Sequence, residues 1–219
     1  MHKKIALAAV IGVFVAGCAT QQPAEQAAEP KAEAKPAAAK AAPALMSGAG
    51  AAMLAHTCAG CHGTHGASNG PAAPTIGGLS EDYMIEVMEA YKSGDRASTI
   101  MGRIAKGYSD EEIAAMAKFY AAQPYVGKVQ TSAGPKSMAG KKLHDEYCEK
   151  CHEDEGRSID DDSGLLAGQW MPYLHWTMDD YAAGMNSGEK RMLKNIKKML
   201  DEHGPSSIEN LVHYYGSRK

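Results

Sequence analysis

Residues 56–66, HTCAGCHGTHG, hold two cysteines, three histidines and three glycines in eleven positions. The same skeleton, Cys-x-x-Cys-His, returns in residues 146–156, EYCEKCHEDEG. Four of the five cysteines of this 219-residue chain lie in these two motifs, and the fifth is Cys18. No cysteine pair is therefore left for a structural disulfide.

The sequence around the two motifs is duplicated as well. A shift of 90 positions superimposes the motifs and also the following pairs: Gly140 on Gly50, Leu166 on Ile76, Gly168 on Gly78, Tyr173 on Tyr83, Met178 on Met88, Tyr181 on Tyr91 and Gly184 on Gly94. Small insertions then change the shift to 91, which pairs Met192 with Met101, and to 95 near the C-terminus. From about Ser47 onward the chain therefore consists of two copies of one domain, joined near residues 124–136.

Each copy has the apolar spacing of helices. In the segment SEDYMIEVMEAYKSG, apolar residues recur at helical spacing after Ser80, a suitable N-cap, and Gly94 ends the pattern. Ser109 and Glu112 have the spacing of a capping box at the start of another helix, which ends before Pro124. These signals predict at least two helices in the first copy.

Shorter helices are expected to run into the two motifs, from Ala49 and from Met138. Because no segment alternates as a strand does, we predict an all-α fold. The chain has only two Phe and two Trp against thirteen Met and 23 Gly. A core that is poor in large aromatic residues and rich in Met and Gly is hard to fill, which suggests that a bulky apolar group other than an amino acid completes it.

The N-terminus has the organisation of an export signal. Residues 1–17 combine the basic start MHKK with an apolar run of thirteen residues, which is too short to span a bilayer. The run ends in VAGC, which resembles a lipobox. We predict a lipoprotein signal peptide over residues 1–17 and a lipidated Cys18 that anchors the protein to a membrane in the periplasm. The alternative is an ordinary exported protein in which Cys18 is incidental.

Residues 18–46 follow as the lipidated cysteine and a segment of Ala, Pro, Glu, Lys and Gln. With almost nothing to bury, this segment is predicted to be a disordered tether. The whole chain is 44% hydrophobic with a formal charge of −3, which suits one or two compact domains. That charge argues against a polycationic nucleic-acid binder, so we expect no nucleic-acid partner.

Cys-x-x-Cys-His is the attachment signal of c-type haem. Two thiols on one turn can add to the two vinyl groups, and the adjacent imidazole then lies beneath the iron. A redox dithiol would need an alternating αβ pattern, and a Cys₄ zinc site would need the two motifs close together. We therefore predict two covalently bound haem c groups, held by Cys58, Cys61 and His62 in the first copy and by Cys148, Cys151 and His152 in the second.

The second axial ligand of each iron must come from elsewhere in the same copy. Met101 lies after the Gly94 helix end and 39 residues past His62, and Met192 lies 40 residues past His152. Both positions suit a loop over the second face of a haem. With His and Met as ligands both axial positions are filled, so such a haem passes electrons and binds no substrate.

Other side chains compete for this role. Met88 and Met178 lie in the middle of helical patterns beside aromatic residues, and we predict that they are packing residues. Five histidines remain as rival ligands, although only His213 falls in an obviously packed helix: His65, His144, His175, His203 and His213.

Longer segments surround the motifs: CAGCHGTHG, GPAAPTI, YKSGDRASTIMGRIAKGYSDEEI, LHDEYCEKCH, LAGQWMPYL and EKRM. Over nearly all of residues 50–215 they resemble the dihaem cytochrome subunit of flavocytochrome c sulfide dehydrogenase. The resemblance implies two tandem class I cytochrome c-like domains, which we place at residues 47–126 and 127–219. It also implies the axial pairs His62 with Met101 and His152 with Met192.

In that family a separate FAD-bearing subunit oxidises sulfide in the periplasm, and the cytochrome subunit takes its electrons. The resemblance implies an FAD-containing sulfide dehydrogenase subunit as heterodimer partner and a downstream acceptor such as a soluble cytochrome c. GAGAAM, residues 48–53, lacks the third glycine and the preceding strand of a flavin fingerprint, so any FAD belongs to the partner. We predict a non-catalytic electron-transfer subunit.

Two other functions are considered. One is a free-standing dihaem carrier between a respiratory complex and a terminal oxidase. The other is an enzyme, either a dihaem peroxidase or a thiosulfate-oxidising cytochrome, which would need an open or cysteine-ligated iron for which no cysteine is spare.

Some features depart from the family or remain open. The second half has no proline that corresponds to Pro71, whose region often supports the proximal histidine in class I cytochromes. Trp170 and Trp176 are predicted to flank a haem or to pack at the domain interface. Charged residues also cluster, and these clusters either form a solvated face or steer a redox partner: Glu153–Glu155, Asp160–Asp162, Lys190, Arg191, Lys194, Lys197 and Lys198.

Overall fold

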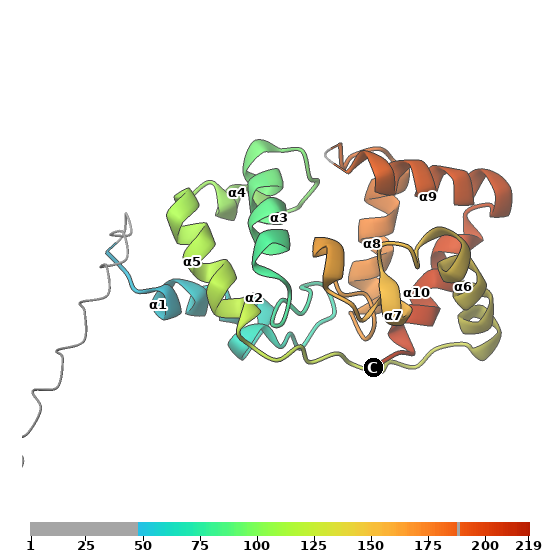
Figure 1. The fold of residues 1–219 in the computed structure, drawn as a ribbon, viewed down its shortest axis with the longest axis horizontal. Helices are drawn as coiled ribbons and strands as arrows, with labels where there is room; N and C mark the ends of the chain where they lie inside the picture. Colours follow the sequence, from blue (N-terminus) through green and yellow to red (C-terminus); the bar gives the residue numbers. More distant parts are fainter. Residues whose placement is uncertain (1–47, 188) are drawn as a thin grey trace, which may run out of the picture. The chain divides into compact units, whose positions relative to one another are not determined.

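Each half of the chain folds into helices around its Cys-x-x-Cys-His motif (Figure 1). A computed structural model describes residues 48–187 and 189–219, so the predicted signal peptide, Cys18 and the tether lie outside the described residues. The first half contains α1 (Ala51–His56), α2 (Ala59–His62), the 3₁₀ turn η1 (Thr64–Gly66), α3 (Glu81–Ser93), α4 (Met101–Ala105) and α5 (Asp110–Ala121). The second half contains α6 (Gly134–Tyr147), α7 (Glu153–Gly156), the 3₁₀ turn η2 (Asp160–Asp162), α8 (Met171–Ala182), α9 (Lys190–His203) and α10 (Ser206–Gly216).

Residues 48–187 and 189–219 contain no strand, which confirms the predicted all-α fold. In the same part of the chain, every helix is too short or too polar to cross a membrane.

The predicted helix ends are present. The Ser80 hydroxyl accepts a hydrogen bond from the Tyr83 backbone N–H at 3.1 Å, and Gly94 closes α3 at a φ of +94°. At α5 the Glu112 N–H donates to the Ser109 hydroxyl at 3.2 Å, while the Ser109 N–H donates to the Glu112 carboxylate at 3.0 Å. Each cap satisfies backbone donors that a helix start leaves open and stabilises the helix by about 1 kcal/mol.

The helices that lead into the motifs differ from the prediction. The first begins at Ala51 and ends at His56, and a separate turn, α2, carries the second cysteine. The second is longer than predicted, because α6 begins at Gly134 rather than Met138. Pro135 lies in its first turn, where the missing N–H has no helical partner to lose, so the helix can extend back to this point.

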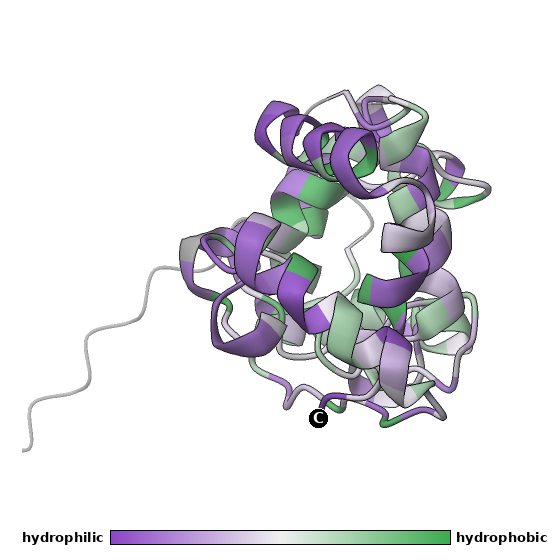
Figure 2. Cartoon of the chain, turned by 90° about the vertical axis from the view of Figure 1, so that its right-hand side faces the viewer, coloured by the Kyte–Doolittle hydropathy of each residue, from purple (hydrophilic) through white to green (hydrophobic). Residues whose placement is uncertain are grey.

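Each half has its own hydrophobic cluster, to which buried side chains such as Tyr120 in the first half and Tyr214 in the second belong. Figure 2 shows ribbons that change between hydrophobic and hydrophilic along each helix, as expected for helices with one buried face. Full burial of one Leu, Ile or Met side chain contributes about 1.5–3 kcal/mol. Leu165 of the second half belongs to the cluster of the first, so the two cores meet.

A polar pair and the interhelical segment join the halves. The Thr75 N–H donates to the Gln169 side-chain oxygen at 2.9 Å, and the Gln169 amide donates back to the Thr75 carbonyl at 3.0 Å. Between α5 and α6, the Lys128 N–H donates to Gly168 and the Gln130 N–H to Gly216, at 2.7 and 2.8 Å. The segment after Pro124 is therefore hydrogen-bonded along the second half.

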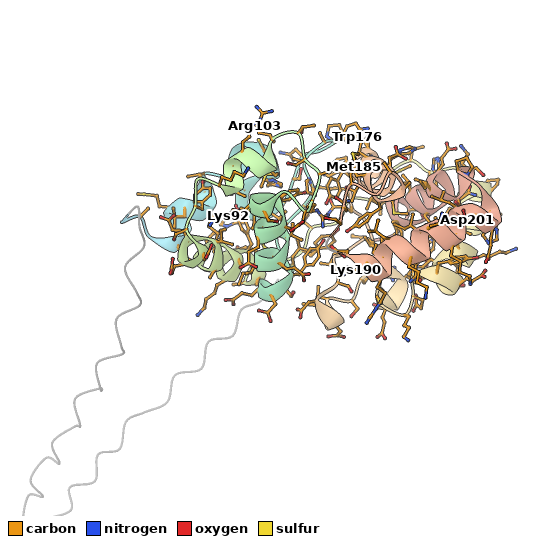
Figure 3. All side chains as sticks on the ribbon, turned by 90° about the horizontal axis from the view of Figure 1, so that it is seen from above. Lys92, Arg103, Trp176, Met185, Lys190 and Asp201 are labelled. Carbon is orange, nitrogen blue, oxygen red and sulfur yellow. The ribbon has the colours of Figure 1, made fainter. Side chains whose placement is uncertain are left out.

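The two tryptophans have different environments. A Cβ added at Gly70 would lie 2.3 Å from the Trp170 ring, so this ring packs on the first half as predicted for an interface residue. Trp176 is 53% exposed on the outer side of α8 (Figure 3), so the prediction of interface or haem packing is wrong for this residue.

Gly140 allows α6 and α10 to approach closely. A Cβ added there would lie 2.0 Å from the Asn210 carbonyl oxygen and 2.7 Å from the Tyr214 Cβ. At Gly50, its equivalent in the first half, an added Cβ would meet nothing within 4 Å. The duplication therefore supplies a matched pair of glycines of which only one is needed for packing.

We expect Gly140→Ala to lower the free energy of unfolding by about 1–3 kcal/mol, because the α10 backbone must move to admit the methyl group. Gly50→Ala, at the exposed start of α1, should change it by less than about 1 kcal/mol. Chemical denaturation followed by far-ultraviolet circular dichroism measures both values. Equal effects would contradict the close approach of α6 and α10.

Candidate functional site

A cavity of about 470 Å³ is lined by residues of both motifs. The lining includes all but one of the predicted haem residues: Cys58, His62 and Met101 from the first half and Cys148, Cys151, His152 and Met192 from the second. Cys61 is exposed on α2 and is absent from the lining. The volume lies within the range of small-molecule and cofactor sites, about 300–1,000 Å³.

The donor set suits covalent attachment of haem. All four motif cysteines are free thiols. Burial raises the pKa of Cys58, and it raises the pKa of Cys148 to about 11, so these two remain protonated at neutral pH. Apolar side chains make up much of the remaining lining, as a porphyrin ring requires: Ile76, Leu79, Ile104, Leu165, Leu166 and Leu174.

Both proximal histidines are oriented by a backbone carbonyl. His62 Nδ1 lies 2.8 Å from the Pro74 carbonyl oxygen, and His152 Nδ1 lies 3.1 Å from that of Gly164. A carbonyl only accepts, so Nδ1 carries the hydrogen in each ring and Nε2 keeps its lone pair for a metal. Burial lowers the pKa of His62 and lowers that of His152 to about 4, so both rings are neutral at pH 7.

These contacts explain how the second half supports its histidine without a proline that corresponds to Pro71. The carbonyl that supports His62 belongs to Pro74 rather than to Pro71, and Gly164 is its equivalent at the shift of 90. Because any residue supplies a carbonyl, the second half keeps the support of its histidine without a proline.

The two predicted axial methionines lie in helices, so the prediction that they lie in loops is wrong. Met101 is the first residue of α4 and Met192 is the third residue of α9. Near Met101, the Gly102 N–H donates to the Ser98 hydroxyl at 2.8 Å, which closes a first helical turn where a loop was expected. Both methionines nevertheless line the cavity.

Met88 and Met178 lie in the middle of α3 and α8, as predicted, and Met178 is buried in the second core cluster. Both also line the cavity. The cavity wall therefore offers four methionines from the first half and two from the second: Met84, Met88, Met101, Met116, Met178 and Met192.

None of the five rival histidines lines the cavity. His65 and His203 are exposed, and His175 is half-buried. The expectation that only His213 is packed is wrong, because His144 on α6 is fully buried at 0% exposure.

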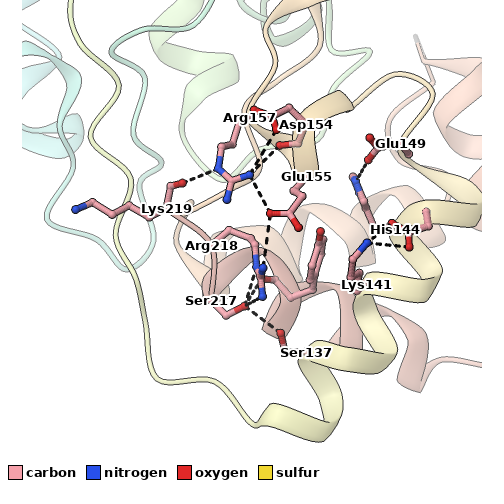
Figure 4. A network of polar contacts seen from close by, with 12 residues as sticks. Ser137, Lys141, His144, Glu149, Asp154, Glu155, Arg157, Ser217, Arg218 and Lys219 are labelled. Carbon is pink, nitrogen blue, oxygen red and sulfur yellow. Dashed lines mark hydrogen bonds and ion pairs between the residues drawn. The ribbon is translucent and has the colours of Figure 1, made fainter.

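His144 is held by a tyrosine and a glutamate. Its Nδ1 lies 2.9 Å from the Tyr215 hydroxyl, and its Nε2 faces the Glu149 carboxylate (Figure 4). In the first half, Leu54 occupies the equivalent position and the Tyr120 hydroxyl donates instead to the Ala55 carbonyl at 2.6 Å. A comparison of the two motifs' flanks could have identified this substitution of a polar for an apolar side chain.

Sequence reasoning also missed a buried cation. Arg96, in the turn after α3, lines the cavity with its side chain 7% exposed and forms an ion pair with Glu189 at 3.3 Å. A buried charge is costly unless it is paired, so its presence in the cavity wall indicates a functional role. The segment YKSGDRAS contains this arginine, but its second-half equivalent is Asn186, so the duplication gave no signal for it.

Comparison with known proteins identifies related sequences. The family model of cytochrome c matches residues 47–121. The chain is 39% identical over 70 residues to cytochrome c-554(548) of Halomonas halodenitrificans, which covers 31% of this chain and 84% of that protein. It is 27% identical over 168 residues to cytochrome c4 of Pseudomonas aeruginosa, which covers 72% of this chain and 83% of that protein.

A further relative is the cytochrome subunit of sulfide dehydrogenase of Chlorobaculum tepidum. The identity is 46% over 68 residues, or 31% of this chain, and the match spans 61% of that subunit. Among solved structures, reduced recombinant cytochrome c4 from Pseudomonas stutzeri has a TM-score of 0.65 at 23% identity and covers 78% of this chain and 100% of that chain. That likeness concerns the fold, and it extends over both halves.

The family carries covalently bound haem c, and the free thiols, oriented imidazoles and apolar cavity described above suit that group. This chain therefore belongs to the cytochrome c family, and its halves fold as two class I cytochrome c domains.

Proposed function

We propose that the chain is a dihaem electron-transfer subunit, with one haem in residues 47–126 and one in residues 127–219. The observation that supports this most strongly is that one cavity is lined by equivalent Cys, His and Met residues from both halves. When bound, haem supplies a one-electron Fe(III)/Fe(II) couple. Two such sites in one interior space suit the passage of electrons through the subunit.

The residues divide this task between attachment and ligation. Cys58 and Cys61, and likewise Cys148 and Cys151, would form the thioether bonds. His62 with Met101, and His152 with Met192, would ligate the two irons. A thioether favours Fe(II) and raises the reduction potential, and two filled axial positions leave no place for a substrate. The catalysis of substrate oxidation would then belong to a partner.

For the partner we favour an FAD-containing sulfide dehydrogenase subunit. A cytochrome subunit of sulfide dehydrogenase is 46% identical to this chain over 68 residues. This chain lacks a flavin fingerprint of its own. The electrons would leave to a downstream acceptor such as a soluble cytochrome c.

A free-standing carrier is the second candidate. The match to the sulfide dehydrogenase subunit covers 31% of this chain, whereas the match to cytochrome c4 covers 72% and therefore extends over both halves. The two candidates share all haem residues, so only the identity of the partner distinguishes them.

A pull-down from native membranes in mild detergent tests the partner. A flavoprotein that co-purifies, with flavin fluorescence and with haem reduction on addition of sulfide, supports the sulfide dehydrogenase subunit. Purified chain without flavin that oxidises sulfide at the same rate would contradict it, and a flavin-free eluate that is reduced by a respiratory complex would favour the carrier.

The axial ligands generate a spectroscopic prediction. A ferric haem with His and Met ligands has a weak near-infrared charge-transfer band that depends on the sulfur. We expect Met101→Ala and Met192→Ala each to remove about half of this band, to open one iron to carbon monoxide, and to lower that haem's potential, because the thioether favours Fe(II).

Met88→Ala and Met178→Ala are the matched controls, because these methionines line the same cavity from mid-helix positions. They should loosen packing and leave the band intact. The axial assignment is wrong if a control abolishes the band while Met101→Ala spares it.

The anchor generates a separate prediction. We propose that residues 1–17 are removed, that Cys18 is lipidated and that a tether holds the domains in the periplasm. Cys18→Ser should then release the protein from membranes without changing its haem spectrum, as fractionation followed by absorption spectroscopy would measure. Persistence of the variant on membranes after a high-salt wash would exclude a lipid anchor at this residue.

A further inference from the structure

The turns that follow α3 and α8 are equivalent segments, and they face each other across the interface. The Ala97 N–H donates to the Asn186 side-chain oxygen at 2.9 Å, and the Ser187 N–H donates to the Asp95 carbonyl at 2.9 Å. A shift of 90 positions superimposes Arg96 on Asn186. At the contact of the two equivalent turns, the first half therefore contributes the cation Arg96 and the second half contributes the neutral Asn186.

Four tyrosines line the cavity beside these turns, and they form two pairs related by the duplication: Tyr83 with Tyr173 and Tyr91 with Tyr181. Burial raises the pKa of Tyr83, Tyr91 and Tyr181. These three phenols are therefore neutral at physiological pH, and each can donate a hydrogen bond but brings no negative charge to balance a cation.

Arg96 projects among these rings. Its guanidinium carbon lies 5.5 Å from the centroid of the Tyr91 ring. Among the described residues, its ion-pair partner is Glu189, whose carboxylate is at 3.3 Å and whose side chain is 39% exposed. A guanidinium is always charged and has five N–H donors, so its contacts with Glu189 and with the Tyr91 hydroxyl leave donors available to the cavity.

We propose that Arg96 binds the carboxylate side chains of the haem groups of both halves and thereby sets the reduction potentials of both. Haem carries two propionate carboxylates as its anionic groups, and a planar guanidinium suits bidentate contact with carboxylates. The duplication gives each haem an equivalent pair of tyrosines, whereas the single arginine at the contact of the two turns is common to both. This inference rests on the proposed dihaem function.

The sign of the effect follows from charge. Reduction lowers the charge of each haem by one, so a nearby buried cation favours the reduced state and raises the potential. Removal of that cation should lower both potentials, and removal of the Glu189 carboxylate, which offsets it, should raise both. If Arg96 only stabilised the fold of one half, the two potentials would not fall together when the cation is removed. Nor would they rise together when the Glu189 carboxylate is removed.

The experiment is a redox titration of the purified holoprotein, followed by haem absorption and fitted with two midpoints. For Arg96→Gln, we expect both midpoint potentials to fall. At a given applied potential the ratio of reduced to oxidised haem should decrease roughly three- to tenfold, and a tenfold decrease corresponds to about 59 mV. Arg96→Lys keeps the charge and should show less than half of this shift. Arg103→Gln is the control, because it removes an equal charge from an exposed side chain of α4 that points away from the molecule (Figure 3).

Glu189→Gln provides a variant that leaves the arginine in place, and both midpoints should rise. If Arg96→Gln does not mature, the direction of this shift decides the proposal. A shift of one midpoint only, no shift, or a shift in Arg103→Gln as large as in Arg96→Gln would overturn it. Mass spectrometry counts the haems of the unmodified protein and of each variant. Two haems with unchanged midpoint potentials would refute the role of Arg96 but not the dihaem function. A count other than two in the unmodified protein would refute the dihaem function.

Discussion

The structure depends on an apolar space that its own side chains do not fill. Two sets of helices enclose a cavity of about 470 Å³, and the cysteines and histidines of both motifs line it except for Cys61. Protein interiors normally pack as densely as organic crystals, so an apolar cavity of this size loses dispersion contacts unless a ligand restores them. The scarcity of Phe and Trp, two of each, follows from the same constraint, because a porphyrin takes the volume that large aromatic side chains occupy elsewhere.

Within this constraint the two halves have diverged in how they support equivalent elements. The tyrosine behind the first cysteine donates to a backbone carbonyl in the first half, and in the second half it meets a buried histidine instead. The helix before the motif is short and open around Gly50, whereas around Gly140 it packs directly on α10. The cysteines and histidines of the motifs are kept in both copies, whereas neighbouring residues such as Leu54 and its equivalent His144 differ.

The sequence predicted the elements whose causes are local. The Ser80 and Ser109 caps and the Gly94 helix end depend on a few adjacent residues, and all three are present. The motif histidines, Met101 and Met192, chosen from duplicated spacing, all line the cavity, and their role as iron ligands stays a prediction. Whether Met101 and Met192 lie in loops depends on hydrogen bonds of neighbouring residues, and this could not be read from spacing alone.

Features set by contacts between segments that are separated in the sequence were beyond prediction from sequence. The burial of His144 depends on α10, which lies some 70 residues further along the chain, and the carbonyl that orients each histidine has no side-chain signature. Arg96 shows the same difficulty, because its environment is built from α3, α8 and the turn before α9. Such environments become visible only when the three-dimensional structure brings these separated segments together.

The contrast between buried and exposed charges bears on which of them can influence electron transfer. The basic run of α9 is largely solvent-exposed, and two of its lysines face acidic residues of the same helix, Lys197 with Asp201 at 3.8 Å and Lys198 with Glu202 at 3.9 Å. Exposed pairs of this kind are worth less than about 1 kcal/mol and are screened by salt within about 10 Å. Arg96 lies in the cavity wall, where the effective dielectric constant is lower and screening is weak. The charge of Arg96 is therefore screened less than the exposed charges of α9, of which Lys190 and Arg191 also line the cavity. Under our proposal, control of the potential is a property of the interface between the two halves rather than of the outer surface.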